Sequence, residues 1–214
     1  MTPKLLLHTC CAPCSVYCVK SLRDEGIEPA LFWYNPNIHP CAEYKSRLGS
    51  LCEFADNEKL TLAQTGEYDL RLFLKEVYPE DENRCLKCYK IRLEKTASFA
   101  SQEGYSAFTT TLLISPYQDH DAIKRAGEEA AAKHGVEFLY RDFRPHFREG
   151  QAQARSRGFY MQKYCGCIFS EEERYNKKLS QRRGGAEEKI VIKQQLCDPC
   201  VSAPLREINS KGTI

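Results

Sequence analysis

The sequence has no long apolar segment and no marked excess of charge of either sign. No stretch approaches the roughly 18 apolar residues of a membrane-spanning helix, and the first residues, MTPKLLLHTCC, lack the basic start and extended apolar run of a secretory signal peptide. Lys and Arg number 31 against 29 Asp and Glu, a net charge of +2. We therefore expect a cytoplasmic protein with no membrane partner, in which any nucleic acid is bound by a local basic patch.

Glycine is missing where a nucleotide-binding loop would need it. The turn after the first apolar run reads Cys10-Cys11-Ala12-Pro13-Cys14 and offers no glycine that would let a phosphate approach the backbone. The turn therefore argues against one alternative function, a tRNA sulfur-transferase of related α/β architecture that uses ATP.

Cysteine, in contrast, is abundant, with 12 residues in a chain of 214. In a short secreted chain this would indicate a disulfide scaffold. This chain shows no secretion signal and is long enough to bury a core without disulfides. Clustered thiols in a reducing compartment indicate metal or redox chemistry.

Short apolar runs alternate with amphipathic helical stretches over the first 140 residues. This alternation predicts an α/β fold, a doubly wound, mostly parallel sheet of the three-layer Rossmann-like kind, with a Cys-rich metal site at the carboxyl ends of the strands. We expect strands at 3–8, 30–34, 60–64, 107–112 and 136–140, and helices at 13–26, 41–57, 69–77, 85–102 and 119–133.

The composition turns polar near Glu171, and Arg182-Arg183-Gly184-Gly185 follows as a flexible joint. We expect an α/β catalytic domain over 1–178 and a polar C-terminal extension over 179–214. The extension carries Cys197 and Cys200, whose role the sequence leaves open.

Seven cysteines form three motifs that we expect to converge, namely Cys10, Cys11 and Cys14, then Cys85 and Cys88, then Cys165 and Cys167. Seven thiols exceed the four that one zinc ion or one iron–sulfur cluster takes, so they indicate a centre plus a second metal or redox-active thiols. Spacing alone leaves zinc and iron–sulfur equally open. The isolated Cys18, Cys41 and Cys52 fall in expected helices and are interpreted as buried, inert thiols.

Six sequence elements occur in a specific order: His8-x-Cys10-Cys11-Ala12-Pro13-Cys14, Tyr34-Asn35-Pro36-Asn37-Ile38-His39-Pro40, Glu43-Tyr44, Arg84-Cys85-x-x-Cys88-Tyr89-x-x-Arg92-Leu93, Thr109-Thr110-Thr111-Leu112 and Tyr164-Cys165-Gly166-Cys167-x-Phe169-Ser170. Together they resemble the QueH-type epoxyqueuosine reductases, from about residue 5 to residue 178. The resemblance implies reduction of epoxyqueuosine to queuosine at the wobble position of tRNA, the last step of that modification, without cobalamin.

The resemblance also implies a [4Fe-4S] cluster and an adjacent second metal ion, expected to be iron. The implied cluster ligands are drawn from Cys10, Cys11, Cys85, Cys88, Cys165 and Cys167, and Cys14 joins this pool as a further metal ligand. The division of the pool between cluster and second metal stays open. The implied partners are a tRNA with a queuosine-type anticodon and an electron donor that the sequence does not identify.

The reaction also needs protons, because an epoxide becomes an alkene with two electrons, two protons and the loss of water. The candidate proton donors lie near the motifs and are His8, Tyr34, His39, Glu43 and Tyr164. Asn35 is a candidate for holding the modified base, although a turn-forming role is the simpler interpretation.

Basic residues interleaved with aromatics between 141 and 169 suit an anticodon loop. We expect phosphate contacts from Lys87, Arg92, Arg144, Arg148, Arg155 and Lys163. The alternative for this pattern is a solvated helix face over core aromatics. A non-catalytic alternative for the whole chain is a zinc-stabilised RNA-binding module, which would leave the number of core thiols unexplained.

Overall fold

The computed structural model describes residues 4–78 and 83–176. In this part of the chain five parallel strands form one sheet in the order β3-β2-β1-β4-β5. The bounds are β1 (Leu5–His8), β2 (Ala30–Trp33), β3 (Leu62–Gln64), β4 (Ala107–Thr110) and β5 (Glu137–Phe138). The expected doubly wound α/β fold is confirmed. The proposed boundary at residue 178, and Cys197 and Cys200, lie outside the described residues.

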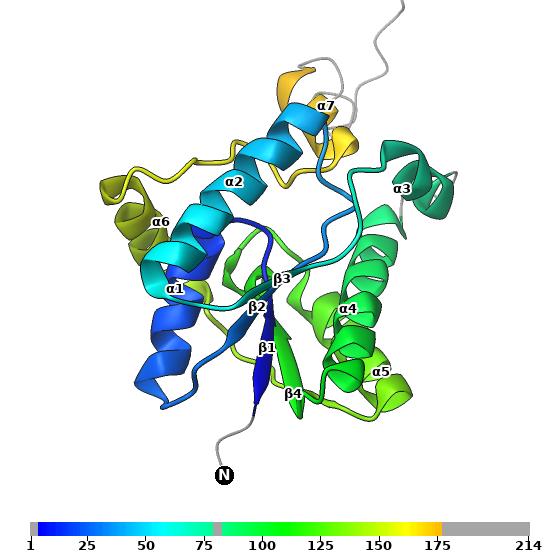
Figure 1. Ribbon diagram of the computed structural model, residues 1–214. Coiled ribbons are helices and arrows are strands. Elements are labelled where there is room, and N and C mark those ends of the chain that lie inside the picture. The colour runs from blue at the N-terminus through cyan, green and yellow to red at the C-terminus, as the bar shows by residue number, and fades with distance from the viewer. Residues whose placement is uncertain (1–3, 79–82, 177–214) are drawn as a thin grey trace, which may run out of the picture.

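Helices cover both faces of the sheet, as Figure 1 shows. On one face α1 (Ala12–Asp24) packs against α6 (Phe147–Ser156), with α2 (Cys41–Glu58) beside α1. On the other face α4 (Arg84–Gln102) packs against α5 (His120–His134). Near the carboxyl ends of the strands lie α3 (Leu70–Val77) and α7 (Ile168–Tyr175). None of the described helices is long and apolar enough to cross a membrane.

The sheet is buried on both faces at its centre, as a parallel sheet between two helical layers must be. Leu5, Leu6 and Leu7 of β1 are at most 1% exposed, and β1 pairs with both β2 and β4. At the edge, Gly127 of α5 lets the helix approach β5, because a Cβ there would lie 2.5 Å from the Phe138 ring. This close packing fixes the layers that position the strand ends.

All five strands are shorter than the sequence predicts, and the fourth and fifth show why. The fourth ends at Thr110 because its hydroxyl accepts the Leu112 N–H and starts a 3-10 turn, η2 (Thr111–Ile114). The fifth keeps only Glu137 and Phe138 at the sheet edge. The helices α6 and α7 and the 3-10 turn η3 (Arg144–His146) were not expected from periodicity.

The three isolated cysteines lie in helices as expected, but only one of them is fully buried. Cys18 of α1 is fully buried, Cys41 at the start of α2 is partly buried, and Cys52 of α2 is exposed. The interpretation of Cys52 as a buried thiol is therefore wrong, since it lies on the solvent face of its helix.

Candidate metal centre and active site

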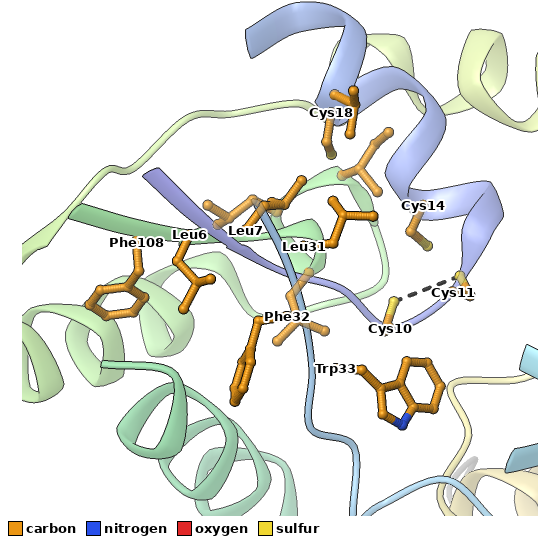
Figure 2. Close-up of a cluster of buried hydrophobic side chains, with 14 of the residues drawn as sticks. Leu6, Leu7, Cys10, Cys11, Cys14, Cys18, Leu31, Phe32, Trp33 and Phe108 are labelled. Atoms are coloured by element: carbon orange, nitrogen blue, oxygen red, sulfur yellow. Dashed lines mark hydrogen bonds between the residues drawn. The ribbon is translucent and has the colours of Figure 1, made fainter. Parts of the chain in front are cut away.

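The first thiol group consists of Cys10, Cys11 and Cys14, at the junction of β1 and α1. Their sulfurs all lie within 4.8 Å of one another, and Figure 2 shows them together where the strand gives way to the helix. Cys11 caps α1, and Pro13 sits in its first turn, where a missing N–H costs nothing. One short segment thus brings three buried thiols together.

Hydrogen bonds favour the thiolate form of Cys10 within this group. Its sulfur lies 3.7 Å from the Cys11 sulfur and accepts the Thr111 hydroxyl at 3.5 Å. Hydrogen bonds with Cys11 and Cys14 lower the pKa of Cys10 well below its usual value, with the Arg92 charge adding to the effect. Burial raises the pKa of Cys11, and the neighbouring Cys10 and Cys11 raise that of Cys14. A bound cation would favour the thiolate forms further, because metal ligands must be deprotonated.

The second thiol group consists of Cys85, Cys88, Cys165 and Cys167 and joins the start of α4 to the segment before α7. Cys88 and Cys167 pack into one buried cluster, whereas Cys85 and Cys165 are exposed. Burial raises the pKa of Cys88 to about 12, with Cys165 and Cys167 adding to the rise and Arg92 opposing it. Among the described residues, only the first group brings three sulfurs within 4.8 Å of one another.

A buried arginine lies between the two groups. Arg92 is 1% exposed. Its guanidinium donates to the Cys88 sulfur at 3.9 Å and to the Asn35 side-chain oxygen at 2.7 Å. Its charge also lowers the pKa of Cys10 in the first group. Arg92 therefore places one positive charge within reach of both sets of thiols.

A second buried arginine holds the segment before α7 in place. Arg47 of α2 donates to the backbone carbonyls of Tyr164 and Cys165, both at 2.9 Å, and to Glu43 at 2.6 Å. Glu43 in turn accepts the Tyr160 hydroxyl at 2.5 Å. Gly166, at φ +125°, fits beneath this arginine, since a Cβ there would lie 3.1 Å from the guanidinium. This network anchors the Cys165–Cys167 turn to α2.

A cavity of about 340 Å³ opens between the thiol groups, within the usual size range for ligand sites. Cys10 and Cys14 of the first group line it, and so does Cys165 of the second. No carboxylate of the described residues lines it, whereas four cationic side chains do: Arg47, Arg92, Lys163 and Arg174. The cavity thus joins both sets of thiols in a positively charged environment.

A family model described as epoxyqueuosine reductase QueH matches residues 5–173. This range contains all seven thiols of the two groups. The chain belongs to the epoxyqueuosine reductase QueH family. Curated members include one from Dehalococcoides mccartyi, 37% identical over 83% of this chain and 97% of that protein, and one from Thermotoga maritima, 35% identical over 84% and 97%. A Haemophilus influenzae member is 36% identical over 78% of this chain and 71% of its own length.

Of the five catalytic candidates that the sequence offers in this QueH-family chain, His8, Tyr34, Asn35, Glu43 and Tyr164, only Tyr164 lines the cavity. Its hydroxyl donates to the His39 carbonyl. Burial raises the pKa of Tyr164 to about 12. Tyr34 instead lines a second cavity of about 330 Å³ beside α3 and α4. Neither Tyr34 nor Glu43 lines the thiol cavity, and Glu43 is paired with Arg47, so their expected role as proton donors stays a prediction.

His8 and Asn35 belong to a closed structural network. The fully buried His8 ring accepts the Thr110 hydroxyl at 2.9 Å and donates to the Tyr34 carbonyl at 3.2 Å. Burial lowers the pKa of His8 to about 3, so the ring is neutral at physiological pH. Asn35 donates to the Thr9 carbonyl at 2.8 Å while it accepts from Arg92. The two side chains thus contact the strand ends and do not line the cavity.

His39 is enclosed as well, with neither ring nitrogen bonded to a described residue. Burial lowers its pKa to about 4, and it does not line the cavity. It is thus a poor candidate for the proton donor at neutral pH.

The expected tRNA contacts separate into several environments. Lys163 lines the cavity, and Arg148 and Arg155 are exposed two turns apart on α6. Arg144 is exposed but paired with Asp142, with hydrogen bonds of 2.8 and 2.6 Å. Lys87 is half-buried in α4.

Arg92 differs from the other residues that were expected to contact tRNA phosphates. Its side chain is buried against the thiols, so it is not a surface phosphate contact. Arg92 instead lies among the thiols, where it donates to the Cys88 sulfur and to Asn35.

Sequence reasoning missed several residues around the cavity, including Arg47, Tyr117, Gln118, Gln162 and Arg174. Gln118 follows β4 and the Thr109–Leu112 motif, and a signal existed for it because ligands bind beyond the carboxyl ends of parallel strands. Gln162 donates to the Cys14 sulfur at 3.4 Å, and Gln118 donates to that of Cys165 at 3.6 Å. Arg47 lies within a helix and carries no comparable sequence signal.

Proposed function

We propose that this chain reduces epoxyqueuosine to queuosine at the wobble position of tRNA. The observation that best supports this function is that thiols of both groups line one cavity with four cationic side chains. The reaction adds two electrons and two protons to the epoxide, forms the alkene and releases the oxygen as water. An electron donor outside the described chain supplies the electrons, since side chains do not deliver them singly.

We infer that the two thiol groups hold different centres. Four thiols from two segments fit the four-cysteine ligation of a [4Fe-4S] cluster, which assigns the cluster to Cys85, Cys88, Cys165 and Cys167. Three converging thiols would suit a single metal ion, expected to be iron, so Cys10, Cys11 and Cys14 would hold that ion. When bound, the cluster supplies single electrons and the metal ion polarises the epoxide oxygen.

The protein's own charges support this assignment. Thiolate-bound centres carry negative charge, and a buried charge needs a nearby partner. Arg92 contacts the Cys88 sulfur, while Arg47 fixes the backbone of Cys165. The two guanidiniums stabilise the deprotonated ligands and hold the Cys165–Cys167 turn against the cavity.

The same cations suit an RNA substrate. Lys163 and Arg174 line the cavity, and Arg148 and Arg155 extend the positive charge along α6. A wobble base reaches the thiols only if it leaves the anticodon stack, as bases do in other base-modifying enzymes. The phosphates on either side of it would then lie against the cationic rim.

The direct test is conversion of tRNA that carries epoxyqueuosine by anaerobically purified full-length protein with a chemical reductant. Mass spectrometry of the digested nucleosides is expected to show loss of one oxygen atom and appearance of queuosine. Cys88→Ala serves as the inactive control. If iron-loaded wild-type protein leaves the epoxide intact, the proposed function is wrong.

RNA binding by α6 has its own test. Arg148→Gln and Arg155→Gln are expected to weaken tRNA binding severalfold, and each is expected to reduce the slope of log K against log salt by about 0.7–0.9 per lost phosphate contact. Arg125→Gln, an exposed position on α5 in the other helical layer, is the matched control. A slope unchanged in both α6 variants would place the RNA elsewhere.

A further inference from the structure

Tyr117 is an unusual residue on the rim of the cavity. Among the large hydrophobic side chains that the structure describes, it is the most exposed, at 84%. It nevertheless lines the cavity together with thiols of both groups. Tyrosine is enriched at binding interfaces because its ring is apolar and its hydroxyl can face water, so this ring is a candidate contact for a partner that enters the cavity.

Hydrogen bonds hold the turn that carries Tyr117, and the exposed ring has one aromatic neighbour. Tyr117 donates its backbone N–H to the Ser115 hydroxyl at 3.3 Å, and the Gln118 N–H donates to the Ser115 carbonyl at 3.4 Å. The ring meets Phe147 edge to face, with centroids 6.0 Å apart and planes at 86°. This geometry supports one edge of the ring and leaves most of its surface open.

The neighbouring residue ties this turn to the reacting end of the cavity. Gln118 donates to the Cys165 sulfur at 3.6 Å, and the Asp119 N–H donates to the Tyr89 hydroxyl at 3.4 Å. Tyr117 is thus one residue away from a contact with the second thiol group, at the point where the cavity meets solvent.

A base that leaves an RNA stack to enter this cavity uncovers one face of the base beside it. Aromatic side chains cover such faces, and each stacked base contributes about 1–3 kcal/mol to binding. We propose that Tyr117 stacks on the anticodon base adjacent to the one that enters the cavity. The proposal rests on the proposed function and adds a residue that recognises the RNA substrate without touching the reacting atoms.

The test is a double-mutant cycle between protein and RNA, measured as the Kd of an anticodon stem-loop for full-length, metal-loaded protein. Tyr117→Ala is expected to weaken binding by about 5- to 150-fold, whereas Tyr117→Phe and Tyr117→Trp retain it, since they keep a flat ring. Two further RNAs each lack one base, on one side or the other of the wobble position. One of these RNAs is expected to bind the wild type more weakly than the intact stem-loop does. The same base deletion is expected to cause no further loss of affinity in Tyr117→Ala, because the stacking contact is already gone.

Tyr78→Ala is the matched control, since Tyr78 is also exposed (72%) but does not line the cavity. It is expected to leave Kd unchanged. If both base deletions weaken binding equally in wild type and Tyr117→Ala, the stacking proposal is overturned, even when wild type reduces epoxyqueuosine. If the coupling is present but the epoxide is never reduced, the proposed function fails and the stacking stands.

Discussion

The two thiol groups reach the same cavity by different routes. The first lies within five consecutive residues, at the end of one buried strand and the start of one helix, and its sulfurs lie within 4.8 Å of one another. The second joins segments that are about 80 residues apart in the sequence, the start of α4 and the turn before α7. Two of its four thiols are exposed.

This difference shows which part of the site depends on distant contacts. The positions of the first three thiols are determined by the backbone where β1 ends and α1 begins. The second depends on Arg47, which bonds the backbone of Tyr164 and Cys165, and on the His39 N–H, which donates to the Gly166 carbonyl at 2.7 Å. We therefore expect the first group to tolerate changes elsewhere in the fold and the second to fail when its anchors are removed.

The largest expected effect comes from deleting one thiol in each group. Cys88→Ala is expected to remove the acid-labile sulfide and the cluster absorbance, because that centre needs all four ligands. Cys11→Ala is expected to keep the sulfide and lose about one iron per chain. Both variants should show no turnover above background. The measurements are iron and sulfide content and absorption spectra of the anaerobic protein. Equal loss of sulfide in both variants would contradict the assignment of the cluster and the single ion to different thiol groups.

Replacing Arg47 should impair the second thiol group but not the first, although no cysteine is changed. Arg47→Met leaves Glu43 buried and unpaired, so the free energy of unfolding is expected to fall by about 3–5 kcal/mol. The second group should lose its metal, while the first keeps its own. Denaturant unfolding and metal analysis give the two readings.

The double variant Arg47→Met/Glu43→Leu is the control for this prediction. It is expected to regain much of the stability, because no unpaired charge is left, without regaining the second centre. A double variant with full cluster content would show that Arg47 does not position the Cys165–Cys167 turn.

Arg92 is predicted to matter to both groups, because its charge acts on Cys10 and on Cys88. Arg92→Met is expected to weaken metal retention by about 10- to 100-fold at both centres, as loss of outer contacts does at other metal sites. Competition with a chelator measures the retention. Arg92→Lys should give an intermediate value, since the charge stays but the fork is lost.

Lys90→Met is the matched control on the same helix, since Lys90 is half-exposed and pairs with Glu129. It should retain metal like the wild type. An Arg92→Met protein that loses metal from only one group would restrict its role to that group.

The smallest effect is expected at Thr111, whose hydroxyl accepts the Cys10 N–H at 3.2 Å and donates to the Cys10 sulfur. Thr111→Val keeps the shape and removes these bonds, at a cost of about 1 kcal/mol. The first group alone should hold its metal about fivefold less tightly. Equal weakening of cluster retention would argue that the two centres are not independent.

Features that depend only on residues close together in the chain could be predicted from the sequence. The run Leu5-Leu6-Leu7 is apolar at every position because β1 is central and covered on both faces. Pro13 marks the start of α1, and Asp119 caps α5 by accepting the Ala122 N–H. The first thiol group could be predicted for the same reason, since one strand–helix junction contains it.

The burial and the partners of several site residues depend on long-range contacts and could not be predicted from the sequence. A motif shows that Arg92 and Glu43 stand near cysteines or aromatics in the chain, but not that each is buried against a partner, Asn35 and Arg47 respectively. His8 reads as a general acid by residue type and is a neutral strand-end residue by burial. The split of seven thiols into three and four needed the placement of α4 against the segment before α7.

The central claim is that two different metal centres share one cavity in a reductase. Its most direct test is the content of iron, zinc and acid-labile sulfide per chain in anaerobically purified wild-type protein. The account predicts several irons with sulfide, and iron in excess of sulfide by about one per chain. Stoichiometric zinc without sulfide, in protein never exposed to air, would contradict it and indicate a zinc-stabilised protein instead.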